Sequence, residues 1–291
     1  MPNGSNDFDD SIGKRIARLR FWSEAKRRLG KDFYRGKHLI LTGYRAADVG
    51  VLLCMGVKLD NIVAVDRNKV AATSAKLRWP NLNVHSEDVL DVARSYTGDL
   101  VTCYADYCAN LCSDLLEKTA VIAGETLNLG GILGVTMFAG RENNKAMRKA
   151  VLSAKRQQEL LGKSSTLSSC TARANTISKT LIRNAKKLSI TPKTVPNPLF
   201  AHYYQNSSGN PMILWIGQTI RATRASEHSL VTNVKIDLLD GLEETLHVES
   251  ANMGRGVELL TNTMLRTTNT LLWRRTISAW RAHVTRGTYS K

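Results

Sequence analysis

Apolar and polar positions alternate in blocks along the first 221 residues, in a way that predicts strands separated by helices. Apolar runs at His38–Thr42, Asn61–Val65 and Asp99–Tyr104 have the length of buried strands, and the segments between them have helical patterns. The first run meets a turn at Gly43, and the second ends at Asp66. Strands that alternate with helices are typical of a parallel sheet covered by helices on both faces.

The pattern also predicts the other elements of this region. We expect helices at about 9–30, 46–55, 68–79 and 113–129, a short strand at 83–85 and a buried strand at 132–138. Residues 141–188 are mostly helical in pattern, and their Ser/Thr-rich stretch at 162–171 is either a loop or the start of another helix.

Two strand-like runs near residue 200 predict an antiparallel hairpin. Leu199–Gln205 and Met212–Arg221 flank the turn sequence NSSGNP. Beyond it, 228–238 and 243–250 are candidates for a second hairpin, and about 257–283 for a long helix. We therefore predict an N-terminal basic helix (1–37), a doubly wound, mostly parallel α/β domain with a terminal antiparallel hairpin strand (38–221), and an α+β C-terminal extension of hairpin and basic helix (222–291).

Composition narrows the class of protein. The chain of 291 residues can bury a full-sized core, and it has no apolar run of about 18 residues that would predict a membrane span. The first thirty residues contain no apolar block, so we expect no secretory signal. Five cysteines give no even disulfide framework, which indicates a reducing, cytoplasmic setting. Cys103, Cys108 and Cys112 lie close in sequence, and buried thiols are favoured there over a metal site.

The net charge of +16 is unevenly distributed. Residues 141–193 hold thirteen bases and two acids, whereas residues 38–140 hold eight bases and eleven acids. Concentrated basic segments predict a nucleic-acid partner, and the alternative is a solvated basic surface. The candidate contacts are Arg148, Lys149, Lys155, Arg156, Lys186, Lys187, Arg274, Arg275, Arg281 and Arg286.

With its strand, Gly turn, helix, acid-terminated strand and final hairpin, the segment 38–221 resembles the class I S-adenosylmethionine-dependent methyltransferase superfamily. The resemblance implies that Gly43 approaches the methionine part of S-adenosylmethionine and that Asp66 binds the ribose hydroxyls. It implies that Asp88, or its neighbour Glu87, meets the adenine amino group.

The resemblance also implies the catalytic pair. Asp106 and Tyr107 stand where amino-directed nucleic-acid methyltransferases place an acid or amide followed by an aromatic residue. A carboxylate there would accept hydrogen bonds from an exocyclic amine, and the aromatic ring would stack on an extruded base.

Each of these residues has a simpler structural role as its alternative. Gly43 suits an ordinary turn, Asp66 an N-cap for the next helix, Asp88 a turn or cap, and Asp106 a cap for the helix near Ser113.

The first loop, LTGYRAAD, has one glycine where the superfamily has two or three, and Tyr44 and Arg45 are expected to narrow the methionine pocket. The sequence therefore predicts a methyltransferase-like protein that acts on nucleic acid, or a catalytically inactive relative that binds nucleic acid as an accessory or structural component. A nicotinamide-dependent oxidoreductase is disfavoured by the final hairpin and the missing glycines.

Overall fold

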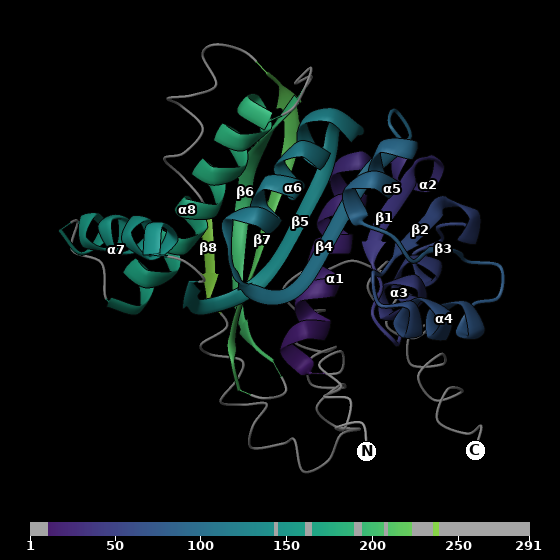
Figure 1. Ribbon diagram of the computed structural model, residues 1–291, viewed down its shortest axis with the longest axis horizontal. Helices are drawn as coiled ribbons and strands as arrows, with labels where there is room; N and C mark the ends of the chain where they lie inside the picture. The colour runs from purple at the N-terminus through teal and green to yellow at the C-terminus, as the bar shows by residue number, and fades with distance from the viewer. Residues whose placement is uncertain are drawn as a thin grey trace.

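The computed structural model describes residues 11–142, 145–160, 165–188, 194–206, 209–222 and 235–238, and the strands in these residues form one sheet (Figure 1). The strands are β1 (Lys37–Leu41), β2 (Ile62–Val65), β3 (Asn83–His85), β4 (Leu100–Leu111), β5 (Leu127–Glu142), β6 (Thr194–Gln205), β7 (Pro211–Arg221) and β8 (Lys235–Leu238).

The order across the sheet is β3-β2-β1-β4-β5-β7-β6-β8. β1 to β5 pair in parallel, and β7 runs antiparallel to both β5 and β6. The predicted doubly wound sheet with a terminal antiparallel hairpin strand is thus confirmed, and its strand order is consistent with the methyltransferase-like α/β fold that the sequence predicts. β8 extends the sheet by pairing in parallel with β6. The rest of the predicted extension, including the strand at 243–250 and the helix at 257–283, lies outside the described residues.

Helices cover both faces of the sheet, because alternate strand residues point to opposite sides. The helices are α1 (Ile12–Leu29), α2 (Asp32–Arg35), α3 (Ala47–Cys54), α4 (Lys69–Arg78), α5 (Val89–Ser95), α6 (Ser113–Val121), α7 (Lys145–Leu160) and α8 (Ser165–Leu188). In β4, Tyr104 packs with residues of α1 and α3, whereas Cys103 packs with residues of α6 and α8. The helix α1 therefore belongs to the same core as the sheet.

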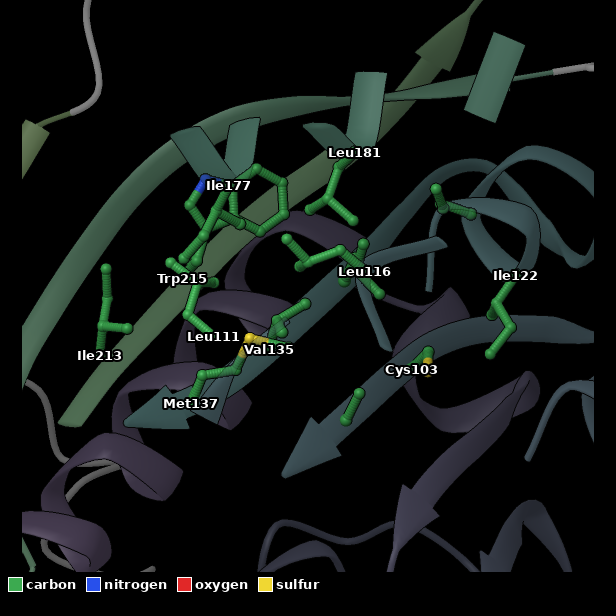
Figure 2. Close-up of a cluster of buried hydrophobic side chains, with 14 of the residues drawn as sticks. Cys103, Leu111, Leu116, Ile122, Val135, Met137, Ile177, Leu181, Ile213 and Trp215 are labelled. Carbon is green, nitrogen blue, oxygen red and sulfur yellow. The ribbon is translucent and has the colours of Figure 1, made fainter. Parts of the chain in front are cut away.

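Figure 2 shows the core on the α6–α8 face, where Leu116 of α6 and Leu181 of α8 meet side chains from β4, β5 and β7. Trp215 of β7 is fully buried, and its indole Nε1 donates a hydrogen bond to Ser178 Oγ at 2.9 Å. Such a partner removes the penalty of burying the indole N–H, so the ring contributes its full apolar area to the core.

Several element boundaries differ from the sequence prediction, and those of β5 (predicted at 132–138) and β6 (predicted from Leu199) are extended. The helix expected at 113–129 ends earlier: α6 stops at Val121, a π-helical turn covers Ile122–Thr126, and β5 begins at Leu127, which pairs with Leu100. The apolar residues of this stretch suit a helix or a strand, and pairing with the neighbouring strand β4 favours the strand β5.

The strand expected at 99–104 is longer than predicted, since β4 continues to Leu111. Asp106 and Tyr107 thus lie within a strand rather than in a turn after it. In the Ser/Thr-rich stretch, α8 begins at Ser165, so the second of the two alternatives, the start of another helix, is the one observed.

Candidate functional site

A cavity of about 360 Å³ lies at the carboxyl ends of β1, β2 and β4. It is at the point where the strand order reverses, which is where open α/β sheets bind ligands, and its volume falls within the range of about 300–1,000 Å³ for ligand pockets. All six residues predicted to bind the cofactor or to act in catalysis line it: Gly43, Asp66, Glu87, Asp88, Asp106 and Tyr107. The fold thus brings together residues that are up to 64 positions apart.

Asp66 is held against the end of β1 by backbone hydrogen bonds. Its Oδ2 accepts from the amide of Gly43 at 3.2 Å, and its Oδ1 accepts from the amide of Asn68 at 2.8 Å. Gly43 has φ +56°, which glycine adopts without strain. The N-cap of α4 is Asn68, whose side chain accepts from the amide of Val70, so the alternative role of Asp66 as the cap is wrong.

Tyr44 and Arg45 do not narrow the cavity, contrary to the sequence expectation. Both side chains are exposed, and neither lines it. The hydroxyl of Tyr44 accepts from Asn68 Nδ2 at 2.9 Å, and its carbonyl accepts from Ser74 Oγ at 3.0 Å. Tyr44 therefore lies over the start of α4. The backbone is left-handed again at Ala46, with φ +46°, so the loop turns sharply without a second glycine.

Asp88 is the N-cap of α5 and also pairs with a lysine. Its side chain accepts from the amide of Leu90 at 3.0 Å and forms an ion pair with Lys118 of α6. Burial would raise the pKa of Asp88, but the hydrogen bonds from Lys118 and Leu90, together with nearby positive charge, outweigh it and lower the pKa. Its neighbour Glu87 is exposed, with His85 Nδ1 at 3.9 Å from its carboxylate.

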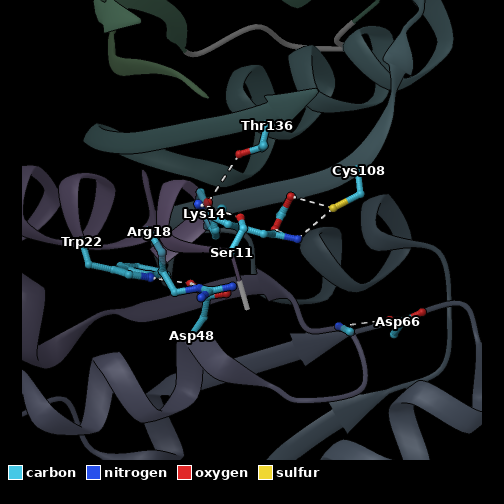
Figure 3. A network of polar contacts seen from close by, with 11 residues as sticks. Ser11, Lys14, Arg18, Trp22, Asp48, Asp66, Cys108 and Thr136 are labelled. Carbon is cyan, nitrogen blue, oxygen red and sulfur yellow. Dashed lines mark hydrogen bonds and ion pairs between the residues drawn. The ribbon is translucent and has the colours of Figure 1, made fainter. Parts of the chain in front are cut away.

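Asp106 forms a buried ion pair with Lys14 of α1, and Figure 3 labels Lys14 and its other partner, Cys108. Lys14 Nζ lies 3.0 Å from Asp106 Oδ2 and 2.9 Å from Cys108 Sγ, and Cys108 Sγ donates to Asp106 Oδ1 at 3.2 Å. The side chains of Lys14 and Asp106 are only 2% and 6% exposed. Burial, followed by the charge of Asp106, raises the pKa of Cys108 to about 12, although Lys14 opposes this. The N-cap of α6 is Cys112, so Asp106 is not a helix cap.

The face of α1 that carries Lys14 continues toward a second acid. Arg18 Nε lies 3.0 Å from Asp48 Oδ1, and Trp22 Nε1 donates to the same oxygen at 2.7 Å (Figure 3). Residues four apart share one face of a helix, so Lys14, Arg18 and Trp22 form a row. The sequence analysis did not identify this row. The spacing of four between these residues was the available signal.

Tyr107 points its hydroxyl at α6. The hydroxyl lies 2.7 Å from Thr119 Oγ1, which itself donates to the carbonyl of Leu115, so Tyr107 donates this hydrogen bond. Burial raises the pKa of Tyr107. The ring packs against the core on this face. A stacked base would therefore reach only the edge of Tyr107 that lines the cavity.

The predicted nucleic-acid contacts lie partly on α7 and α8. Arg148, Lys149, Arg156 and Lys187 are exposed, while Lys155 and Lys186 are half-buried. Lys155 Nζ is 3.5 Å from a carboxylate oxygen of Glu159. The four candidates Arg274, Arg275, Arg281 and Arg286 lie outside the described residues.

In the part of the chain that the structure describes, no group of His, Cys, Asp and Glu side chains is arranged to hold a metal ion. Within the same ranges, no helix has both the length and the apolar character needed to span a membrane.

No protein-family model matches the chain, and no curated protein does. Among solved structures, it is similar to Trm1 from Pyrococcus horikoshii in complex with S-adenosyl-L-methionine (11% identity, TM-score 0.44, 78% of this chain and 60% of that one). It is also similar to an O-methyltransferase from Bacillus cereus in complex with SAH (12%, TM-score 0.39, 72% and 82%). A third similar structure is an rRNA methylase from Streptococcus thermophilus (12%, TM-score 0.37, 72% and 98%). The chain spans 60% of the Trm1 structure, and at such identities the likenesses concern the fold alone.

Proposed function

We propose that this protein binds S-adenosylmethionine in the cavity at the ends of β1, β2 and β4 and transfers its methyl group to a nucleic acid. The observation that carries the proposal is the position of Asp66, whose carboxylate faces the cavity next to the left-handed turn at Gly43. In a doubly wound sheet, an acid at this place accepts both hydroxyls of a ribose.

The lining of the cavity suits this cofactor. Asp66 accepts one amide hydrogen bond on each oxygen, and each oxygen has a further lone pair for a ribose hydroxyl. Apolar walls from Leu41, Val65 and Val89 suit an adenine ring. Five acids line the cavity against three bases, which suits a sulfonium cation. When bound, S-adenosylmethionine supplies an electrophilic methyl group, and the protein contributes by holding the acceptor in line with it.

The acceptor side of the cavity is formed by Asp106. Its carboxylate is held by Lys14 and Cys108, but each oxygen can accept a further hydrogen bond. An exocyclic amine held there would keep its own lone pair directed toward the methyl group. The net charge of +16 supports a nucleic acid as the molecule that carries this amine.

The described chain contains five free cysteines, which supports a reducing, cytoplasmic setting.

Equilibrium dialysis with labelled S-adenosylmethionine tests the proposal. We expect saturable binding by the wild-type protein and a loss of about tenfold or more in Asp66→Asn, because two charge-assisted hydrogen bonds to the ribose are weakened. Asp91→Asn is the matched control, since Asp91 is an exposed acid of α5 that does not line the cavity. Absence of saturable binding at millimolar concentrations of S-adenosylmethionine would contradict the proposal.

A second candidate is a catalytically inactive protein of the same fold that binds nucleic acid as an accessory or structural component. The buried ion pair between Lys14 and Asp106 favours it, because a neutralised and almost inaccessible acid is poorly placed to receive an acceptor amine. This candidate predicts salt-sensitive nucleic-acid binding that Asp66→Asn leaves unchanged, with no cofactor bound. Transfer of labelled methyl groups to RNA or DNA by the purified protein would exclude it.

A further inference from the structure

A second cavity, of about 880 Å³, lies between α7 and α8. The two helices pack on each other at the β6 end of the sheet, away from α2–α4 (Figure 1). On the α7 side it is lined by Ala146, Ala150 and Ala154, which are four residues apart and share one face. These short side chains leave the space open, and we call it the α7–α8 groove.

The bases that line the α7–α8 groove come from α8. Lys179, Arg183 and Lys187 are exposed and spaced by four, so they form a row with steps of about 6 Å along the helix. None of the three has a carboxylate partner among the described residues. Across the described residues of α7 and α8 there are ten bases and one acid, so the whole region attracts anions.

The wall of the groove also offers hydrogen-bonding groups. Asn175 and Thr176 of α8 and Gln157 of α7 line it. The Oδ1 atom of Asn175 is buried and accepts no hydrogen bond from any described residue. Buried polar atoms normally have partners, so we expect a hydroxyl or amine of a ligand that enters the groove to this depth to satisfy the acceptor. A phosphate backbone with attached sugars and bases provides both the charges and these donors.

The groove ends near the first cavity. Ser113, at the start of α6, lines the α7–α8 groove, and Leu115 and Lys118 of the same helix line the cavity that contains Asp66 and Asp106. A chain lying in the groove would therefore pass the first turn of α6 on its way to the cavity.

We propose that the α7–α8 groove binds a single phosphodiester strand of the nucleic acid and directs it past α6 toward the first cavity. The direction of the strand rests on the proposed function, whereas binding in the groove does not. The exposed bases of the groove form one row along α8, which suits the single row of phosphates of one strand rather than the two rows of a duplex. A flat membrane surface would touch only the rim and would leave Asn175 unpartnered.

Fluorescence anisotropy with single-stranded RNA, and with DNA of the same sequence, tests this proposal. The groove variant is Lys179→Gln/Arg183→Gln. Its matched control is Lys76→Gln/Arg78→Gln, which removes the same charge from exposed residues of α4 that line neither the groove nor the first cavity. We expect the groove variant to lose about tenfold or more in affinity and the control to lose about twofold or less, with the salt slope of the groove variant reduced by about 0.7 for each lost phosphate contact.

Three results would overturn the proposal: equal losses in the two variants, no binding of either nucleic acid, or tighter binding to phosphatidylserine vesicles than to both strands. Binding of RNA, DNA or both with the expected difference between variants supports it. S-adenosylmethionine binding is measured in the same three proteins and should be equal. If strand binding depends on the groove but no cofactor binds, the groove proposal stands and the methyl-transfer proposal is wrong. If the cofactor binds but strand binding does not depend on the groove, the methyl-transfer proposal stands and the groove proposal is wrong.

Discussion

At the scale of single residues, the pairing of Lys14 with Asp106 is the feature that most affects the chemistry of the cavity. Two opposite charges are buried within 3.0 Å of each other, and Cys108 joins them with its backbone in the left-handed region at φ +45°. A non-glycine residue in this region is strained, and such strain is common at functional sites. The pair fixes the position of Asp106 and neutralises its charge.

A double-mutant cycle measures how strongly this pair is coupled. Lys14→Met leaves the buried carboxylate of Asp106 without its cation, and Asp106→Asn leaves the ammonium without its anion. We expect each single variant to lose about 3–5 kcal/mol of unfolding free energy, and the double variant to lose less than the sum of the two. Urea denaturation of the four proteins gives the coupling energy. Strictly additive losses would contradict a direct pair.

At the scale of elements, α1 is the part of the molecule that sequence reasoning described least well. Its bounds were predicted within three residues, because Ser11 and Gly30 are good helix ends. Its contacts were not predicted, because helical periodicity shows which residues share a face. It does not show which acids from distant parts of the chain meet that face. The pattern therefore did not predict the position of Arg18, which is 4% exposed and lies beside Asp48.

The close packing of α1 depends on Gly13. A Cβ atom added there would lie 2.5 Å from the backbone carbonyl oxygen of Gln205 in β6, so either α1 or the strand must shift. We expect Gly13→Ala to lower the unfolding free energy by about 1–3 kcal/mol, because the clash outweighs the gain of about 1 kcal/mol in helix propensity. Ser23→Ala on the same helix is the control, and its stability should hardly change. A more stable Gly13→Ala variant would show that α1 does not approach β6 this closely.

At the scale of the whole molecule, the sheet was predictable and the surface that surrounds its cavity was not. The strand order follows from elements that each carry a clear pattern, so Gly43, Asp66 and Asp106 arrive at one edge of the sheet as expected. The α7–α8 groove depends on how two helices lie against each other. The excess of bases predicted that this region contacts nucleic acid. Only the packing of the helices shows that Lys179 and Arg183 line the groove and that Arg148 and Arg156 do not.

The pH dependence of stability reports on the whole fold through His38. This residue of β1 is fully buried and bonds to α2 and β4: its Nε2 donates to the carbonyl of Phe33 at 2.7 Å, which leaves Nδ1 to accept from Thr102 Oγ1 at 2.9 Å. Burial lowers its pKa from 6.5 to about 4, even though the hydrogen bond to Phe33 opposes the shift. The imidazole is therefore neutral in the folded protein at pH 7.

Because the unfolded chain takes up a proton at His38 near pH 6.5 and the folded chain only near pH 4, the unfolded state binds more protons between these values. Stability therefore falls as the pH is lowered through this window, by about 2 kcal/mol between pH 7 and pH 4.5 from His38 alone. His38→Gln keeps a donor and an acceptor but cannot titrate here. Urea denaturation at several pH values should show that the unfolding free energy of this variant falls by about 2 kcal/mol less than that of the wild type between pH 7 and pH 4.5. Carboxylates such as Asp88 titrate in both proteins, so parallel pH profiles would contradict a buried neutral His38.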